Sequence, residues 1–315
     1  MRETVVTLRD GSEVRLPVIG QGTWVMGEAP ARRSAEIEAL RLGFSLGMTV
    51  VDTAELYAAG RSERLVGEAI RDCRDKVFLV TKVWPSNARE EGVLRALQGS
   101  LRRLGTDHVD ALLLHWPTRS VPIDETLRGL ERALRQGMTR HVGLSNFPPA
   151  LMAGAERAAT DAAPIAFHEV RYGLDERRAE RFALPDAQSH GRVLLAYSPL
   201  AHGRLMRAPG VSVLREIADR RAVSAERVAL AWSVGRPGVV AIPKAGRAEH
   251  VRDNAAAGDL VLDGAEVARL EAAFPLSPGE LPSRLPPYGA FFRLAMWGMR
   301  RRFPERSEEG ASPPA

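Results

Sequence analysis

Residues 50–57 read VVDTAELY, in which the apolar pair Val50-Val51 runs directly into the carboxylate of Asp52, and Tyr57 follows five residues later. A short apolar run bounded by polar residues is typical of a buried strand. The chain repeats this arrangement, and short aliphatic runs alternate along it with longer segments rich in Ala, Leu, Arg and Glu. Such alternation indicates a series of strand-helix units.

Eight strands are expected after an opening hairpin, whose turn is Asp10-Gly11 between TVVTL and EVRLP. The expected strands cover residues 18–22, 49–53, 77–82, 109–115, 141–146, 165–170, 193–198 and 238–243. Helices are expected at residues 34–46, 63–71, 89–104, 125–135, 149–157, 176–190, 213–220 and 225–234, the last with Ser224 as its N-cap.

Eight such units in roughly 250 residues predict an α/β protein with a closed parallel (β/α)8 TIM barrel. An open doubly wound sheet is the alternative, but the stretch IGQGTWVMG after the first strand does not match the G-x-G-x-x-G phosphate loop of that fold. We expect a single barrel domain over residues 1–275, with the N-terminal β-hairpin as a cap.

Residues 276–315 are expected to form an extended C-terminal loop segment and tail, rich in proline and then aromatic and basic. Two interpretations stay open. Either this segment packs on the barrel close to the substrate, or its stretch AFFRLAMWGMRRRF forms an amphipathic basic helix that contacts a membrane surface or a partner.

Composition limits the class of protein. The chain has 315 residues, of which 45% are hydrophobic and 26% charged, so it can bury a large core. Its longest apolar runs are far shorter than the roughly 20 residues of a membrane span. The N-terminus lacks the features of a signal peptide, and Cys73 has no second cysteine to pair with. We therefore expect a cytoplasmic protein. A net charge of +5 is a small excess and does not favour a nucleic-acid partner.

Polar residues recur where the expected strands end. They are Asp52, Lys82, His115, Ser145 with Asn146, His168 with Glu169, Tyr197 and Lys244. In parallel barrels the active-site groups lie at the carboxyl ends of the strands, so we expect these side chains to share one rim.

Tyrosine, lysine, aspartate and histidine together favour the protonation of a carbonyl oxygen. A free tyrosine has a pKa of about 10. A lysine ammonium beside it lowers that pKa, an aspartate keeps the lysine charged, and a histidine can hydrogen-bond the same substrate oxygen. Reduction of the carbonyl then needs a hydride, which implies a nicotinamide cofactor.

Other reaction classes are less favoured. No strong nucleophile pairs with a base, which argues against acyl transfer. Neither H-x-H nor H-E-x-x-H occurs, so no metal site is expected. A metal-dependent barrel hydrolase is a further alternative, and loss of activity on addition of a chelator would identify it.

Six ordered stretches between Val18 and Asn254 resemble the aldo-keto reductase superfamily. They are VVDTAELY, VTKVW, LLLHWP, VGLSNF, AYSPLAHGRL and AIPKAGRAEHVRDN, and the last resembles bacterial members that reduce small aldehydes such as methylglyoxal. The resemblance implies a monomeric enzyme that binds NADPH, with NADH possible, and reduces aldehydes or ketones to alcohols.

By the same resemblance, the catalytic residues would be Asp52, Tyr57, Lys82 and His115, with Tyr57 as the proton donor. The substrate pocket would include Trp24, Trp84 and Trp116. Voltage-gated potassium-channel β subunits also resemble this family, so a cofactor-binding regulatory subunit is the alternative. The complete catalytic set favours an enzyme.

The resemblance also implies a cofactor site. It would consist of Ser145, Asn146, Glu169, Tyr197, Ser198, Pro199, Leu200, Gly203, Lys244, Ala245, His250, Asp253 and Asn254. Ser145 and Asn146 would hold the nicotinamide carboxamide, Tyr197 would stack on the ring, and Lys244 would contact the adenosine 2′-phosphate.

Three of these positions depart from the usual family pattern. Glu169 replaces a glutamine, and a carboxylate accepts a hydrogen bond from the carboxamide but cannot donate one back. His250 replaces an arginine and Ala245 a serine or threonine, and a neutral histidine does not reproduce a bidentate arginine contact. We therefore expect a preference for NADPH that is weaker than in a typical member.

Overall fold

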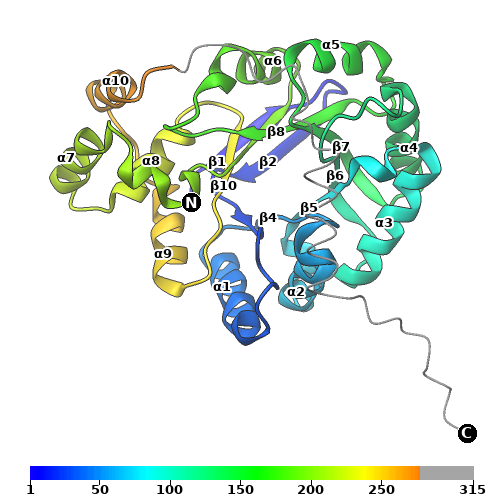
Figure 1. Ribbon diagram of the computed structural model, residues 1–315, viewed down its shortest axis with the longest axis horizontal. Coiled ribbons are helices and arrows are strands. Elements are labelled where there is room, and N and C mark those ends of the chain that lie inside the picture. Colours follow the sequence, from blue (N-terminus) through cyan, green and yellow to red (C-terminus); the bar gives the residue numbers. More distant parts are fainter. Residues whose placement is uncertain (277–315) are drawn as a thin grey trace, which may run out of the picture. The chain divides into compact units, whose positions relative to one another are not determined.

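The barrel strands follow one another around a single parallel sheet in the computed structural model, which describes residues 1–276 (Figure 1). They are β3 (Gln21–Gly22), β4 (Val50–Asp52), β5 (Phe78–Val83), β6 (Val109–Leu114), β7 (Thr139–Ser145), β8 (Ile165–Arg171), β9 (Val193–Tyr197) and β10 (Val239–Ile242). The last strand returns to the first. Gly20 N donates to Ala241 O at 2.8 Å, and Ala241 N donates to Val18 O at 2.9 Å. The expected (β/α)8 barrel is confirmed.

Helices surround the sheet (Figure 1). They are α1 (Arg33–Ser45), α2 (Arg61–Ile70), α3 (Glu90–Leu104), α4 (Ile123–Arg135), α5 (Pro149–Ala158), α6 (Ala183–Ser189), α7 (Val211–Arg221), α8 (Ala225–Ser233), α9 (Ala248–Ala257) and α10 (Gly264–Ala273). As expected, Ser224 caps α8, since its side chain accepts from Arg227 N at 3.0 Å.

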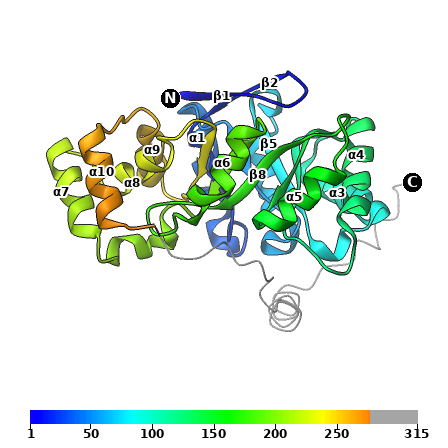
Figure 2. The same ribbon diagram turned by 90° about the horizontal axis from the view of Figure 1, so that it is seen from above.

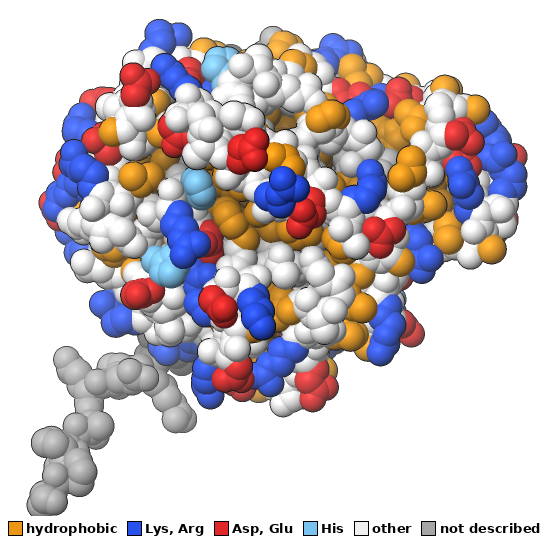
Figure 3. Space-filling view, turned by 180° about the vertical axis from the view of Figure 1, so that it is seen from behind, with side chains coloured by type: hydrophobic (Ala, Val, Ile, Leu, Met, Phe, Trp, Pro, Cys, Tyr) orange, Lys and Arg blue, Asp and Glu red, His pale blue; other side chains and the backbone are white. Residues whose placement is uncertain are grey.

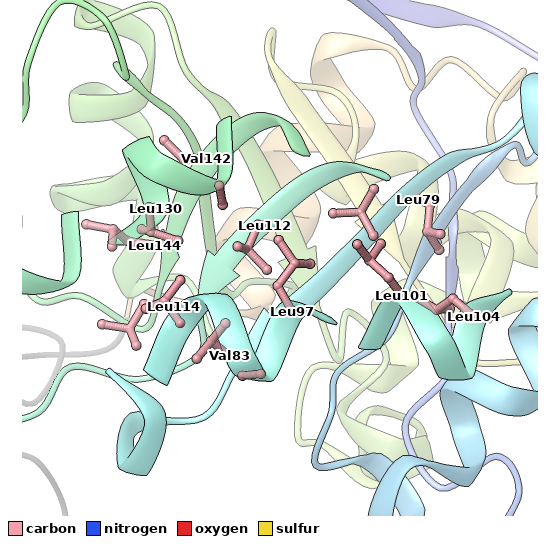
Figure 4. Close-up of a cluster of buried hydrophobic side chains, with 14 of the residues drawn as sticks. Leu79, Val83, Leu97, Leu101, Leu104, Leu112, Leu114, Leu130, Val142 and Leu144 are labelled. Atoms are coloured by element: carbon pink, nitrogen blue, oxygen red, sulfur yellow. The ribbon is translucent and has the colours of Figure 1, made fainter. Parts of the chain in front are cut away.

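The outer core lies between helices and strands. Helix α3 has apolar side chains at helical spacing, and Leu97, Leu101 and Leu104 pack with Leu79 and Leu112 of β5 and β6 (Figure 4). Complete burial of one such side chain stabilises the fold by about 1.5–3 kcal/mol. This layer fixes each helix against its strand and holds the loops between them.

The inner core fills the barrel, because successive side chains of a strand point to opposite faces. Val50, Val80, Leu113 and Phe167 face inward and cluster with buried residues of the hairpin β1 (Glu3–Thr7) and β2 (Glu13–Pro17). Gly238, just before β10, donates from its N–H to the Thr4 hydroxyl at 3.0 Å. The hairpin therefore covers the end at which the strands begin (Figure 2), and a site is left to the end at which they finish.

The helix expected over residues 176–190 is wrong in its first half. The chain forms the short 3-10 helix η5 (Arg178–Arg181) and then α6. Between them Phe182 has φ −139° and ψ −59°, which is not helical. Pro185 has no N–H with which to continue a helical hydrogen bond to the preceding turn.

Helices α9 and α10 are absent from the sequence-based expectation. The sequence does carry a signal for α10, a capping box in which Glu266 N donates to Asp263 Oδ1 at 2.8 Å and Asp263 N donates to Glu266 Oε2 at 3.0 Å.

Charged side chains of both signs are interspersed over the face shown in Figure 3. Within residues 1–276 many charged side chains form ion pairs, as Arg9 does with Glu156 at 2.7 Å. Within residues 1–276 no helix has the length and apolar character needed to cross a membrane. Apart from Leu276, the C-terminal segment expected over residues 276–315 lies outside the described residues.

Candidate active site

The inward face of the barrel changes from apolar to polar at the ends of five strands, β4, β5, β6, β8 and β9. Two positions after an apolar interior residue, the same face carries a polar one, as in Val50 and Asp52, Val80 and Lys82, Leu113 and His115, Phe167 and Glu169, and Leu195 and Tyr197. Because parallel strands finish at the same end of the barrel, these polar side chains gather there, opposite the hairpin.

Lys82 lies at the centre of this group and is fully buried. Its Nζ donates to Asp52 Oδ1 at 2.5 Å, to the Thr53 carbonyl oxygen at 3.0 Å and to the Tyr57 hydroxyl at 3.3 Å. An ammonium group has three hydrogens, and each has an acceptor in this site. The Tyr57 oxygen accepts from Lys82, so its own hydrogen can be given to another acceptor.

Burial dominates the proton affinities of the group. Burial alone lowers the pKa of Lys82, but Asp52 and Glu169 outweigh it and raise that pKa, so the ammonium stays charged. Burial raises the pKa of Tyr57 by more than Lys82 lowers it. The expected effect of Lys82 on the tyrosine is present, but it does not prevail. The phenol therefore keeps its proton, which is the state a proton donor needs.

His115 is neutral for a related reason. Burial, and then the charge of Lys82, lower its pKa well below the usual range. Its Nδ1 is buried and has no hydrogen-bond partner among residues 1–276. A neutral imidazole in this position can donate or accept a hydrogen bond at a substrate oxygen without adding charge.

Aromatic rings enclose the polar group. The Trp24 and Tyr57 rings meet edge to face with their centroids 5.0 Å apart, and Trp84 meets His115 in the same way at 5.3 Å. Trp24 is 40% exposed, and Trp116 is half-buried directly after His115. A polar centre with apolar walls is typical of a pocket for a small organic ligand.

Glu55 positions one of these walls and is a residue that the sequence reasoning missed. Its Oε1 accepts from Trp84 N at 2.6 Å and from Asn87 Nδ2 at 3.0 Å. Burial raises its pKa. Glu55 thus ties the loop after β4 to the loop after β5. A contact between two loops follows no periodicity, so only its place in VVDTAELY could have suggested it.

A second set of polar contacts follows β7 and β9. The Tyr197 hydroxyl donates to Asn146 Oδ1 at 2.8 Å, while Asn146 Nδ2 donates to Ser145 Oγ at 2.9 Å and to the His115 carbonyl oxygen at 3.1 Å. This network connects the ends of three strands and fixes the orientation of the Asn146 amide.

Backbone strain is concentrated on the same rim. Within residues 1–276, eight non-glycine residues have a positive φ, and all but Ala222 lie in loops that follow strands: Val25, Ala58, Ala59, Asn146, Ser198, Ala201 and His202. Such conformations cost about 1–3 kcal/mol each and are concentrated at functional sites in proteins generally.

Other predicted cofactor residues lie after β9, after β10 and on α9. Pro199, Leu200 and Gly203 belong to the turn that includes η6 (Ala201–Arg207). Lys244 is exposed and Ala245 half-buried. His250 Nε2 lies 2.6 Å from Arg247 Nη2.

Asp253 is already engaged away from this loop. It pairs with Arg227 at 2.6 Å and accepts from the Ser224 hydroxyl. The neighbouring Asn254 is buried, with 6% of its surface exposed.

Glu169 and His168 face opposite sides of β8. Glu169 faces inward, 2% exposed, and its Oε2 lies 3.3 Å from Lys82 Nζ. It also pairs in register with Ser145 of β7. The sequence places Glu169 at the rim but gives no indication that it reaches Lys82 on the other side of the barrel.

His168, which the sequence placed at the rim, faces outward instead. It lines a cavity of about 290 Å³ together with Phe147, Met152 and Phe182. Burial, and then the charge of Arg192, lower its pKa to about 3, so it is neutral. In the part of the chain that the structure describes, no three His, Cys, Asp or Glu side chains are placed to hold a metal ion.

Comparisons with known proteins agree on one family. The sequence profile of the aldo/keto reductase family matches residues 18–274. Methylglyoxal reductase YeaE of Escherichia coli K12 is 42% identical over 276 residues, which is 85% of this chain and 94% of that protein.

Two crystal structures from Klebsiella pneumoniae are also similar. One is an aldo/keto reductase in complex with NADP and acetate, with 40% identity and a TM-score of 0.82 over 88% of this chain and 98% of that one. The other is an aldo-keto reductase in complex with NADPH, with 40% identity and a TM-score of 0.82 over 89% and 98% of the two chains.

Proposed function

Because this chain belongs to the aldo/keto reductase family, we propose that it is an NADPH-dependent oxidoreductase that reduces small aldehydes or ketones to alcohols. One observation carries the proposal. The Tyr57 hydroxyl accepts from the buried Lys82 ammonium, keeps its own hydrogen, and lies against the aromatic walls formed by Trp24 and His115. The Escherichia coli relative is named a methylglyoxal reductase, which supports small aldehydes such as methylglyoxal as the substrate class.

The rim residues fit a nicotinamide cofactor. Tyr197 and Ser145 fix the orientation of the Asn146 amide. A side chain that hydrogen-bonds the nicotinamide carboxamide needs such a fixed orientation. Tyr197 offers a half-buried ring, and the exposed ammonium of Lys244 suits the adenosine 2′-phosphate. Asn254 is the remaining candidate at the adenine, since Asp253 is paired with Arg227. When bound, the cofactor supplies the hydride.

The side chains then divide the remaining work. Tyr57 donates its proton to the carbonyl oxygen, and Lys82 holds the phenol in place and stabilises the phenolate that is left. Asp52 holds Lys82 at 2.5 Å. The neutral His115 hydrogen-bonds the carbonyl oxygen, and the Trp24 and Trp84 rings exclude water from the reacting groups.

The preference for NADPH over NADH should be moderate. Lys244 offers an exposed positive charge to the 2′-phosphate. Ala245 has no hydroxyl to donate to that phosphate, and the His250 ring nitrogen already contacts Arg247. Arg247 can add a second cation close to the 2′-phosphate. The expectations of a monomer located in the cytoplasm, made from the sequence, stay predictions.

The first experiment is to follow the oxidation of NADPH, and separately of NADH, with methylglyoxal, aromatic aldehydes and aldoses. Turnover of a small aldehyde with a higher kcat/KM for NADPH is expected. Tight NADPH binding without turnover on any of these carbonyls would instead favour the regulatory alternative. Loss of activity with a chelator would contradict proton donation by Tyr57 as the chemistry of this site.

A further inference from the structure

The buried cluster at the end of the barrel contains more acid than base. Asp52, Glu169 and Lys82 are each at most 3% exposed. They come from β4, β8 and β5, and the neighbouring titratable groups are Tyr57 after β4 and His115 after β6. Tyr57 and His115 are neutral, so full ionisation would leave two carboxylates and one ammonium. That is one uncompensated negative charge on side chains that are almost fully buried, which is costly.

The hydrogen bonds show which carboxyl is uncompensated. The three hydrogens of Lys82 go to Asp52, to the Thr53 carbonyl and to Tyr57. Glu169 Oε2 lies 3.3 Å from Lys82 Nζ, and within residues 1–276 it has no hydrogen-bond partner. A buried acceptor of this kind calls for a donor.

The two carboxyl groups also interact with each other. A hydrogen bond between their side chains acts to lower the pKa of Asp52 and to raise the pKa of Glu169. We propose that Asp52 and Glu169 share one proton in the protein at neutral pH and that Glu169 carries it. The proton makes Glu169 a neutral acid whose hydroxyl donates to Asp52. Asp52 thereby stays an anion and keeps its bond to Lys82. Two carboxyl groups that share a buried site commonly behave in this way, because both cannot ionise together.

Burial raises the pKa of both carboxyl groups, and the hydrogen bond from Lys82 to Asp52 assigns the proton to Glu169. Burial and the charge of Asp52 raise its pKa to about 8, and Lys82 opposes them without prevailing. The proton is therefore present at neutral pH and is lost as the pH rises through about 8.

The consequence for the cofactor rests on the proposed function. A protonated carboxyl has one hydroxyl donor, which the proposal gives to Asp52, and it keeps acceptor capacity on its carbonyl oxygen. Glu169 can then offer its carbonyl oxygen to the N–H of the nicotinamide carboxamide without adding a second negative charge beside it. Glu169 would still accept from the carboxamide and not donate to it, as the sequence-based expectation has it, but as a neutral acid in place of a carboxylate.

Infrared difference spectroscopy of the cofactor-free protein tests the proton directly. The carbonyl stretch of a protonated carboxylic acid should appear in the wild-type minus Glu169→Gln spectrum at about pH 6 and should be absent at about pH 10. Glu55, whose pKa burial also raises, is present in both proteins and cancels. If the difference at the lower pH contains only ionised carboxylate bands, the proposal is wrong.

Two further variants complete the test. Glu176→Gln is the matched control, because Glu176 is also buried but accepts from Arg178 Nε at 2.7 Å. Its difference spectrum should show only ionised carboxylate. Asp52→Asn removes the second carboxylate and frees one Lys82 hydrogen for Glu169, so the acid band should disappear. If the band persists in Asp52→Asn, burial alone holds the proton and the shared pair is refuted.

These measurements need neither cofactor nor turnover. A protein that shows the acid band but reduces no carbonyl would refute the proposed function and leave the proton pair standing. A protein that reduces methylglyoxal but lacks the band would support the proposed function and refute the proton pair.

Discussion

Lys82 Nζ donates to the Tyr57 hydroxyl oxygen at 3.3 Å, and its two other hydrogens are taken by Asp52 and by the Thr53 carbonyl. The direction of this bond matters for chemistry. Lys82 fills an acceptor position on the phenol and leaves the phenolic hydrogen available. The arrangement favours the loss of that hydrogen only when a substrate oxygen can receive it.

Tyr57→Phe removes this hydrogen without changing the ring. We expect kcat for carbonyl reduction to fall by roughly 10²–10⁴-fold, because general acid catalysis contributes about that much. The Kd for NADPH, measured by quenching of protein fluorescence, should change little. Tyr172→Phe is the matched control, since Tyr172 is buried in the core beside Trp232. Near wild-type turnover by Tyr57→Phe would show that another residue donates the proton, and His115 would be the first candidate.

Lys244→Ala tests the contact with the cofactor phosphate. A hydrogen bond to a charged group contributes about 1.5 kcal/mol or more, so the Kd for NADPH should rise roughly tenfold. The Kd for NADH, which lacks the phosphate, should stay unchanged. The chain has only three lysines, and the exposed Lys76, just before β5, provides the control Lys76→Ala. Equal weakening of both cofactors would show that Lys244 does not select the phosphate.

Glu169→Gln should change how the stability of the protein depends on pH. The pKa of Glu169 is raised to about 8 in the folded protein, against roughly 4.3 in an unfolded chain. Between these values the folded state holds a proton that the unfolded state has lost. The wild-type free energy of unfolding therefore falls as the pH rises through this window, and glutamine has no such dependence.

Urea unfolding at about pH 5 and about pH 9 measures this effect. The difference in unfolding free energy, variant minus wild type, should rise between the two conditions by an amount on the order of a few kcal/mol. Glu176→Gln should not show such a rise, because Arg178 outweighs burial and lowers the pKa of Glu176. The same difference for Glu169→Gln at both pH values would contradict a raised pKa.

Leu97→Ala tests the outer core that supports the strand ends. Leu97 is fully buried between α3 and the sheet (Figure 4), and the cavity left by its loss should cost about 2–5 kcal/mol of unfolding free energy. Leu151→Ala on α5, where Leu151 is 40% exposed, should change stability by no more than about 0.5 kcal/mol. Thermal or urea unfolding of both variants makes the comparison, and equal effects would argue against the packing described for α3.

Most of the barrel was predictable because its signals are local. The apolar runs that became β4 to β10, the Asp10-Gly11 turn and the Ser224 cap each depend on residues close together in the chain. The failures were local too. Pro185 could have divided the expected helix over residues 176–190, and Asp263 with Glu266 could have announced α10.

The side of its strand on which each site residue lies could also be predicted from the sequence. Side chains alternate with a period of two, so Asp52 shares a face with Val50 and Glu169 shares one with Phe167. The same alternation puts His168 on the outer face, beside Phe147 and Met152. Strict use of that period would have removed His168 from the predicted rim.

The sequence by itself therefore determined the eight strand-helix units, the side of each strand that faces inward, and the family. Closure of the barrel decided which side chains from different strands contact each other. Lys82 and Glu169 are 87 residues apart in the numbering, yet their charged atoms lie 3.3 Å apart, and only the circular sheet brings β5 and β8 together across its interior. The same burial removes water from Asp52, Tyr57 and Glu169. Proton affinity depends on that loss of water and on charges across the barrel, and neither is a property of any one strand.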